Sequence, residues 1–489
     1  MTSEPRSRFL IDLYAAACER LPAVECITLT ADGGKAPCEL VVGLPLSYAR
    51  HRRRYPLAIV FDGQAMCGSV IEMSRLMADT REIRESLVVV VRTPTHQWLA
   101  GSAPPARAIT ALLAALARRY RIDGGPVLAF AGGDGAAAPA LAAAADPRLR
   151  LYGEGDHGIA AFVDALRRLL STGIEYGRGM PALRRPWWTP LLRACAPLAR
   201  RLMRPPTEPP GREGLHRLRS HALDRDFEIF VWLPQAASLE RPVPALFVLD
   251  ASIEFSTVAE AAYRLAAAGS IEPVAVIGVG VPRAEGHYGF AFRRFEEFSP
   301  MPSDGYAWGD DLGHIFRALF ALRGEDARLR LGRAPDLLTF LTDELLPVLL
   351  HLPIDTDALG LLGHSAGGTF VGYALAQPRS PFRDYIGVSP GIAIGGDWLL
   401  RALPSAHPAL RTRSARFVIG GEERINAFNV IAGIPRTRSY VEQLCARGID
   451  ARYGCYDGET HSSIYPRAVE DALKAVYARP AVDRSWRSA

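Results

Sequence analysis

The residues best suited to chemistry lie in the pentapeptide Gly363-His364-Ser365-Ala366-Gly367, which Gly368 follows. The apolar run ALGLL precedes it and the helical stretch TFVGYALA follows it, which predicts a strand, a tight turn and a helix. Such a turn strains its central residue and crowds the neighbouring Cβ atoms, which explains the flanking glycines. It would expose the Ser365 hydroxyl as a nucleophile, and the Ala366 N–H would face a developing oxyanion. An ordinary glycine-rich turn is the alternative interpretation.

A serine hydroxyl is a weak nucleophile at neutral pH, so this chemistry also needs a base. In hydrolases built on this turn the order along the chain is serine, acid, histidine. The histidines downstream are His407 and His461. We predict that His461 is the base, because it lies between the strand-like run ARYGCY and the helical run YPRAVEDALKAV. His407 lies between helical stretches and is expected on the surface.

The acid is expected where the preceding strand, in RFVIGGEER, ends. Glu422 and Glu423 both qualify by position. A carboxylate there would hold the imidazole in its productive tautomer and stabilise the imidazolium. Solvated loop charges are the alternative interpretation of these glutamates. The chemistry requires no metal and no organic cofactor.

The elements that must position these residues belong to an α/β pattern. Short β-branched runs such as LVVVV and VAVIGVG alternate with Ala- and Leu-rich helical runs. This alternation predicts parallel strands covered by helices. In such sheets a ligand binds at the carboxyl ends of the strands.

The chain also repeats itself. CELVVGLP ends at Pro45 and FEIFVWLP at Pro234, an offset of 189 residues, and two strand-like runs end at Asp62 and Asp250, an offset of 188. Further on, VLAFAGGDGAAAPALAAAADP resembles ALGLLGHSAGGTFVGYALAQP, and a final block places a histidine opposite His461. Four blocks in one order indicate two copies of one α/β unit.

The second copy resembles a known family, and several stretches beyond the pentapeptide carry the resemblance. They are LFVLDAS, the segment 294–300 (RFEEFSP), the helix GRAPDLLTFLTDELLPVL, the tetrapeptide Gly420-Gly421-Glu422-Glu423 and GETHSS. Together they resemble the esterase family that includes esterase D and the enterobactin-type siderophore esterases. The resemblance covers about residues 214–480 in order.

The resemblance implies an α/β-hydrolase-like, parallel-rich sheet with helices on both faces, present twice, with the N-terminal copy truncated. It implies a serine esterase that acts through an acyl-enzyme, with Glu423 as the acid. It also places a second oxyanion N–H at Ala251, where the family usually has glycine. A siderophore lactone and simple acyl esters are both allowed as substrates. The stretch SPGIAIGGDW departs from the family's pattern, so the shape of the pocket is left open.

Substrate contacts are expected from Arg294 and His364. Arg294 would bind an anionic group of the substrate, or else pair with Glu296 or Glu297. The aromatic and Gly-rich stretch 282–311 is expected to form a lid, with a plain structural loop as the alternative.

The sequence of the first copy lacks the residues that this chemistry needs. Asp134 aligns with Ser365, and only 23 residues separate Asp134 from His157, against 96 between Ser365 and His461. That distance leaves no room for a strand carrying an acid. Asp62-Gly63-Gln64 nevertheless keeps the family's oxyanion-loop pattern. We predict a degenerate, non-catalytic copy, with a second site that uses Asp134 as nucleophile as the alternative. The expected parts are an N-terminal extension (1–19), a degenerate α/β-hydrolase-like domain (20–172), a Pro/Arg-rich linker (173–213), a catalytic domain (214–480) and a C-terminal tail (481–489).

Composition excludes several classes of protein. With 49% hydrophobic and 22% charged residues, disorder is excluded for most of the chain. Its net charge of +5 comes from arginines spread over every segment, with lysine only at Lys35 and Lys474, which argues against nucleic-acid binding. The seven cysteines form no CxxC pair, so neither disulfides nor a zinc site is expected.

No apolar run is long enough for a membrane span, and the first residues do not resemble a secretory signal. We therefore expect a cytoplasmic protein without stable membrane insertion, acting on a small-molecule ester, with a homo-oligomer allowed. Trp187 and Trp188 of the linker are expected to pack on one of the domains, with membrane contact as the alternative. The rival functions are an acyltransferase that uses the same site and a non-catalytic binding protein.

Overall fold

The chain forms two compact units. One contains Met1–Ile174 and Ser256–Arg264, and the other contains Glu175–Phe255 and Leu265–Ala489. The residues described by this computed structural model are 23–29, 37–49, 51–61, 66–79, 82–93, 105–131, 146–152, 159–171, 216–282, 285, 293–294, 296–300, 332–392, 394–401, 403, 410, 412–425 and 433–478.

The first unit contains a six-stranded sheet. Its strands are β1 (Val24–Leu29), β2 (Cys38–Gly43), β3 (Tyr55–Phe61), β4 (Leu87–Val91), β5 (Ile122–Ala131) and β6 (Leu149–Tyr152), and its helices include α2 (Cys67–Asp79), α4 (Pro105–Arg119) and α6 (Ile159–Leu170). The strand order is β1-β2-β4-β3-β5-β6. The pairs β1–β2 and β2–β4 are antiparallel, and the remaining pairs are parallel. All side chains of β3 and β4 are buried, as in strands covered on both faces.

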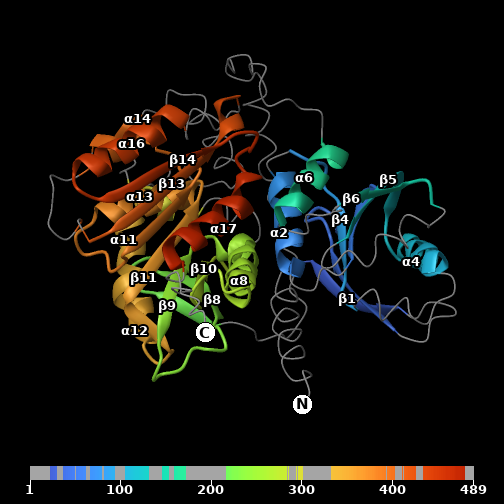
Figure 1. The fold of residues 1–489 in the computed structure, drawn as a ribbon, viewed down its shortest axis with the longest axis horizontal. Helices are drawn as coiled ribbons and strands as arrows, with labels where there is room; N and C mark the ends of the chain where they lie inside the picture. The colour runs from blue at the N-terminus through green and yellow to red at the C-terminus, as the bar shows by residue number, and fades with distance from the viewer. Residues whose placement is uncertain are drawn as a thin grey trace, which may run out of the picture. The chain divides into compact units, whose positions relative to one another are not determined.

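The second unit contains an eight-stranded sheet (Figure 1). Its strands are β7 (His216–Ser220), β8 (Arg225–Trp232), β9 (Val243–Val248), β10 (Ala275–Gly280), β11 (Ile354–His364), β12 (Asp384–Val388), β13 (Ser414–Gly420) and β14 (Asp450–Tyr456). Its helical segments include both ends of α8 (Ala251–Ala267), whose middle part Ser256–Arg264 belongs to the first unit. The others are α11 (Ala334–Thr339), the π-helical η4 (Phe340–Leu345), α12 (Leu346–Leu349), α13 (Ala366–Ala376), α14 (Ile394–Arg401), the 3-10 helix η6 (Gly421–Ile425), α16 (Ile434–Ala446) and α17 (Ile464–Tyr477). The strand order is β14-β13-β12-β11-β9-β10-β8-β7, with antiparallel pairing only at β7–β8 and β8–β10 among these strands.

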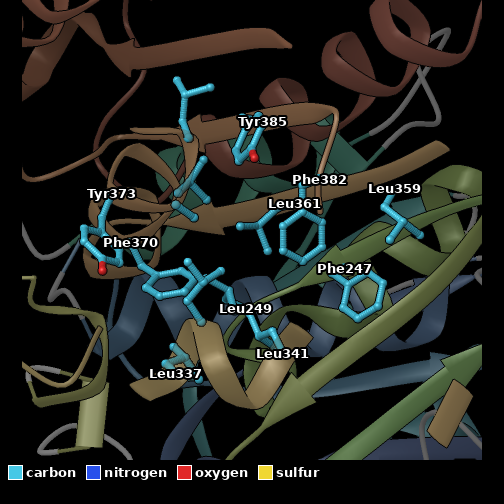
Figure 2. Close-up of a cluster of buried hydrophobic side chains, with 14 of the residues drawn as sticks. Phe247, Leu249, Leu337, Leu341, Leu359, Leu361, Phe370, Tyr373, Phe382 and Tyr385 are labelled. Atoms are coloured by element: carbon cyan, nitrogen blue, oxygen red, sulfur yellow. The ribbon is translucent and has the colours of Figure 1, made fainter. Parts of the chain in front are cut away.

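Helices cover both faces of this second sheet. On one face Phe247 and Leu249 near the end of β9 pack with Leu361 of β11, Phe370 of α13 and Leu341 of η4 (Figure 2). On the other face a Cβ atom at Gly360 would lie 2.6 Å from the Tyr477 hydroxyl of α17, so that helix packs tightly on β11. The expected α/β-hydrolase-like sheet is therefore confirmed.

The two sheets share their strand order. Counted along the chain, β1 to β6 hold the same order and the same pairing directions as β7 to β12. In each sheet the third and fifth strands pair with a register shift. The shift follows Tyr55 of β3 in the first sheet and Asp355 of β11 in the second. Among the described strands of the first unit none extends the sheet as β13 and β14 extend the second.

The final helix ends in the same way in both units. In the first, Ile83 forms a bridge with Ser171, just after α6; in the second, Ile271 forms a bridge with Ala478, just after α17. A neighbouring hydrogen bond is also repeated, from Arg84 N to Leu170 O (3.0 Å) and from Glu272 N to Tyr477 O (2.8 Å). Ile83 and Ile271 are 188 residues apart, which is the offset of the sequence repeat. These contacts support the alignment of α6 with α17, while the duplication itself stays a prediction.

Candidate active site

The pentapeptide adopts a strained strand–turn–helix geometry. β11 ends at His364, Ser365 has φ 57° and ψ −118°, and α13 begins at Ala366. A positive φ is costly for a residue with a Cβ atom, so the surrounding structure must hold it. The Ser365 N–H donates to the Val388 carbonyl oxygen at the end of β12 (2.8 Å). A Cβ atom at Gly363 would lie 2.5 Å from the backbone of Gly367, so only glycine fits there.

Glu423 is the glutamate that lies beside His461. It belongs to η6, directly after β13, and its side chain is 0% exposed. Its Oε2 lies 2.9 Å from His461 Nδ1, and its Oε1 accepts hydrogen bonds from Ser389 Oγ (2.5 Å) and Gly420 N (2.9 Å). Glu422 is partly exposed, and its N–H donates to the Glu459 carbonyl oxygen.

These contacts keep the Glu423 carboxylate ionised. Burial alone would raise the pKa of Glu423. The His461 ring and the hydrogen bonds from Ser389 and Gly420 outweigh burial and lower that pKa below its usual value. An ionised carboxylate only accepts, so His461 Nδ1 carries a hydrogen and the lone pair lies on Nε2, where a base needs it.

His461 lies beside the strained turn. It follows β14 in the short connection to α17 and is 6% exposed. Its carbonyl oxygen is 2.8 Å from His364 Nε2, and the two rings have centroids 4.9 Å apart. Because His364 directly precedes Ser365, this contact brings the candidate base to the candidate nucleophile.

The two candidate oxyanion donors occupy equivalent places. Ala366 is the first residue of α13, and Ala251 is the first residue of α8. The first N–H groups of a helix have no intrahelical partner, so both can donate to another acceptor. Asp250, before Ala251, has φ 54°, so the turns before both helices contain a residue in the left-handed region.

Arg294 has a partner that the sequence did not indicate. Its Nε donates to Asp250 Oδ1 (2.8 Å). Burial raises the pKa of Asp250 to about 7, with Arg294 opposing the rise. Glu296 and Glu297, the partners expected from the sequence, accept hydrogen bonds from Arg225 and, for Glu297, also from Arg293.

His364 differs from the expectation that it binds substrate. It is only 2% exposed, and its ring nitrogens lie 2.9 Å from Glu254 Oε1 and 2.8 Å from the His461 carbonyl oxygen. Protein atoms therefore occupy both nitrogens, which corrects that expectation.

Sequence reasoning missed Ser389, Glu254 and the pairing role of Asp250. Ser389 is fully buried with φ 46°, and its N–H donates to Val418 O (2.7 Å) while its hydroxyl binds Glu423. A Ser-Pro pair directly after the strand next to β11 was the available clue. Asp62, Asp134, His157, His407, the linker 173–213 and most of the expected lid lie outside the described residues.

No protein-family model matches the chain. The chain is similar to the ferri-bacillibactin esterase BesA of Bacillus subtilis (strain 168), with 23% identity over 289 residues that cover 54% of this chain and 89% of that esterase. The resemblance to siderophore esterases is confirmed. Among solved structures the chain is similar to the BES protein from Bacillus cereus, at 19% identity and a TM-score of 0.42, covering 56% of this chain and 100% of that one. It is also similar to the siderophore hydrolase EstA from Aspergillus nidulans, at 20% identity and a TM-score of 0.43, covering 55% and 97%.

The expected class, carboxylic ester hydrolase, agrees with the names of these relatives. In the described part of the chain, no helix has the length and apolar character that a membrane crossing requires.

Proposed function

We propose that this chain is a serine hydrolase that cleaves carboxylic esters through an acyl-enzyme on Ser365. The observation that carries the proposal is the buried Glu423–His461 hydrogen bond of 2.9 Å, placed beside a serine with positive φ at the start of a helix. A carboxylate, an imidazole and a strained serine that follow strands of one sheet form the arrangement that activates a hydroxyl.

In the first step His461 Nε2 takes the Ser365 proton as Ser365 Oγ attacks the ester carbonyl carbon. The negative charge that develops on the carbonyl oxygen is stabilised by the N–H groups of Ala366 and Ala251. The C–O bond then breaks, and the alcohol leaves with the proton that His461 returns. Water repeats the sequence on the acyl-enzyme and releases the acid and free Ser365.

Glu423 serves this cycle by its charge and by its position. It holds the Nδ1–H tautomer of His461 and stabilises the imidazolium that forms in each half-reaction. Ser389 and Gly420 bind the other oxygen of Glu423, so the carboxylate cannot rotate away from the ring.

The substrate that the relatives favour is a siderophore-type ester, and BesA is named for a ferric siderophore. Arg294 is a candidate for an anionic substrate group, although its Nε already binds Asp250. A panel of catecholate lactones and simple acyl esters would rank these substrate classes by kcat/KM. The same panel with an added alcohol separates hydrolysis from acyl transfer, because a transferase would form the new ester.

The first unit is proposed to be a non-catalytic copy. Its described sheet has no strand in the place of β13, which carries Glu423 through η6 in the second unit. A fluorophosphonate probe tests both proposals at once. We expect one labelled serine per chain, with labelling lost in Ser365→Ala. Labelling that survives this change would overturn the assignment.

A further inference from the structure

A buried polar pair next to the proposed nucleophile has no role in the mechanism above. His364 and Glu254 are 2% and 1% exposed, and Nδ1 of His364 lies 2.9 Å from Oε1 of Glu254. The other ring nitrogen, Nε2, lies 2.8 Å from the main-chain carbonyl oxygen of His461. Burying two titratable side chains is costly unless they are paired, and these two are hydrogen-bonded to each other and, through Nε2, to the main chain.

The hydrogen positions of the pair follow from its partners. A carbonyl oxygen can only accept, so Nε2 of His364 must carry a hydrogen. At Nδ1 one proton is shared with Glu254: either an imidazolium donates to the carboxylate, or the protonated glutamate donates to the neutral ring. In both cases Nε2–H still donates to His461. The carbonyl oxygen thus fixes the hydrogen on Nε2, and Glu254 orients the ring through its hydrogen bond at Nδ1.

We propose that His364, oriented by Glu254, is a positioning residue. It holds the main chain of His461 in the place from which the His461 ring reaches Ser365. This inference rests on the proposed function, because it assigns His461 the role of base. His461 is then fixed at two points, its ring by Glu423 and its carbonyl oxygen by His364.

The pair connects the three segments that supply the reacting groups. His364 ends β11 and precedes Ser365, Glu254 lies in the first turn of α8 after Ala251, and His461 lies between β14 and α17. One hydrogen-bonded chain, Glu254–His364–His461, therefore sets the relative positions of nucleophile, oxyanion donor and base. An apolar residue at 364 would fill the space but leave the carbonyl oxygen of His461 without its donor.

A second pair adjoins the first. Arg294 donates to Asp250 Oδ1 (2.8 Å) and makes a longer contact from its guanidinium to the His364 carbonyl oxygen (3.4 Å). His364 and Glu254 together sum to zero charge wherever the shared proton lies, and Arg294 balances Asp250 when that carboxyl is ionised. Local charge balance allows the cluster to stay buried without changing the donor at Nε2.

The test replaces the Nε2–H donor of His364 and measures kcat and KM separately. His364→Phe keeps an aromatic ring but removes Nε2–H; we expect kcat to fall about 10²-fold, the cost of a misplacement of about 1 Å. KM should change by less than about threefold, because the substrate pocket is not touched. His364→Gln carries an amide N–H that can reach the same carbonyl oxygen, and we expect it to recover kcat to within about tenfold of wild type.

Glu254 variants test whether Glu254 orients the His364 ring. Glu254→Gln can still donate to Nδ1, so it should stay close to wild type. Glu254→Leu removes the partner that orients the ring at Nδ1, so it should lose part of the kcat that His364→Phe loses. The double variant His364→Phe/Glu254→Leu should be no slower than His364→Phe alone, because Glu254 acts only through His364.

Tyr385→Phe is the matched control, since it removes a buried hydrogen bond (2.8 Å to Ser380 Oγ) from the same unit outside the site. It should lower Tm and leave kcat unchanged. Wild-type kcat in His364→Phe, or in Glu254→Leu, would overturn the positioning role. Equal loss in His364→Phe and His364→Gln with unchanged Tm would also overturn it, since the donor would then not matter. Failure of the proposed function would look different, because the wild-type chain would neither hydrolyse esters nor react with the fluorophosphonate probe.

Discussion

The two sheets of this chain agree where they share strands and differ where the chemistry is expected. β1 to β6 have the order and directions of β7 to β12, and both units end their last helix with the same bridge and hydrogen bond. The second sheet continues through β13 and β14, the strands that precede Glu423 and His461. In the described part of the first unit, a sheet of the same order thus forms without counterparts of the strands that precede the acid and the base.

The buried core and the reacting side chains depend on different strands of a sheet. One core cluster of the first unit is built on β2, β3, β4 and β5 with α4, and the edge strands β1 and β6 add only partly buried side chains to it. Catalytic geometry, by contrast, needs every strand end that carries a reacting side chain. A sheet can thus lose its outer strands and keep its core, whereas a triad cannot lose one member and keep its full rate.

The largest effect is expected from the nucleophile. Ser365→Ala should lower ester turnover by at least about 10³-fold, because no other group can form the acyl-enzyme. Asp134→Ala, at the aligned position of the first unit, should leave kcat/KM unchanged. Purified variants are compared by ester hydrolysis, with circular dichroism to check folding. A collapse of activity in folded Asp134→Ala would show that the first unit has a site of its own.

Substitution of each glutamate of η6 distinguishes the proposed acid from its neighbour. Glu423→Gln should lower kcat about 10²- to 10⁴-fold, because the amide no longer holds the productive tautomer or stabilises the imidazolium. Glu422→Gln should stay within about twofold of wild type, as for a partly exposed charge. Near-normal kcat in both variants would instead indicate a Ser–His dyad.

Local sequence predicted Ser365 and His461 because a strained turn needs glycines and because the base follows the last strand. It could not separate Glu422 from Glu423, because both follow β13 and the turn of η6 decides which carboxylate faces His461. Ser389 and Glu254 were out of reach, since their partners lie 34 and 110 residues away along the chain. The repeat predicted two sheets. It did not predict that β6 would pair with β5 in the same way as β12 pairs with β11.

A smaller effect than the loss of turnover is expected in the pH dependence of the free energy of unfolding. Because the pKa of folded Glu423 lies below its ordinary value of 4.5, the ionised group stabilises the fold above that pH. That contribution is lost as the pH falls through the lower, folded value. Urea unfolding at a series of pH values should show wild type and Glu423→Gln converging in stability only below about pH 4.5.

Asp146 of the first unit is the comparison for this experiment. The hydrogen bond from Arg148 lowers the pKa of Asp146, but this pair is partly exposed. Asp146→Asn should therefore change the free energy of unfolding by less than about 1 kcal/mol, and salt should screen the effect. A difference between wild type and Glu423→Gln that salt removes would mean that Glu423 acts as a surface charge.

The smallest effects distinguish the two cores. Ile59 of β3 and Phe247 of β9 are fully buried and 188 residues apart, so they hold the same place in the repeat. Ile59→Val and Phe247→Leu should each cost on the order of 1 kcal/mol of stability, because the first removes one buried carbon atom and the second removes three. Phe247 packs against Phe382 with ring centroids 5.3 Å apart, in the core beneath α13 and Ser365. Fluorophosphonate labelling measured while the temperature rises should therefore end earlier in Phe247→Leu than in wild type, but at the wild-type temperature in Ile59→Val. If Ile59→Val shifted the loss of labelling as far as Phe247→Leu does, the first unit would be required for the fold of the site, and its conserved strand order would have a functional reason.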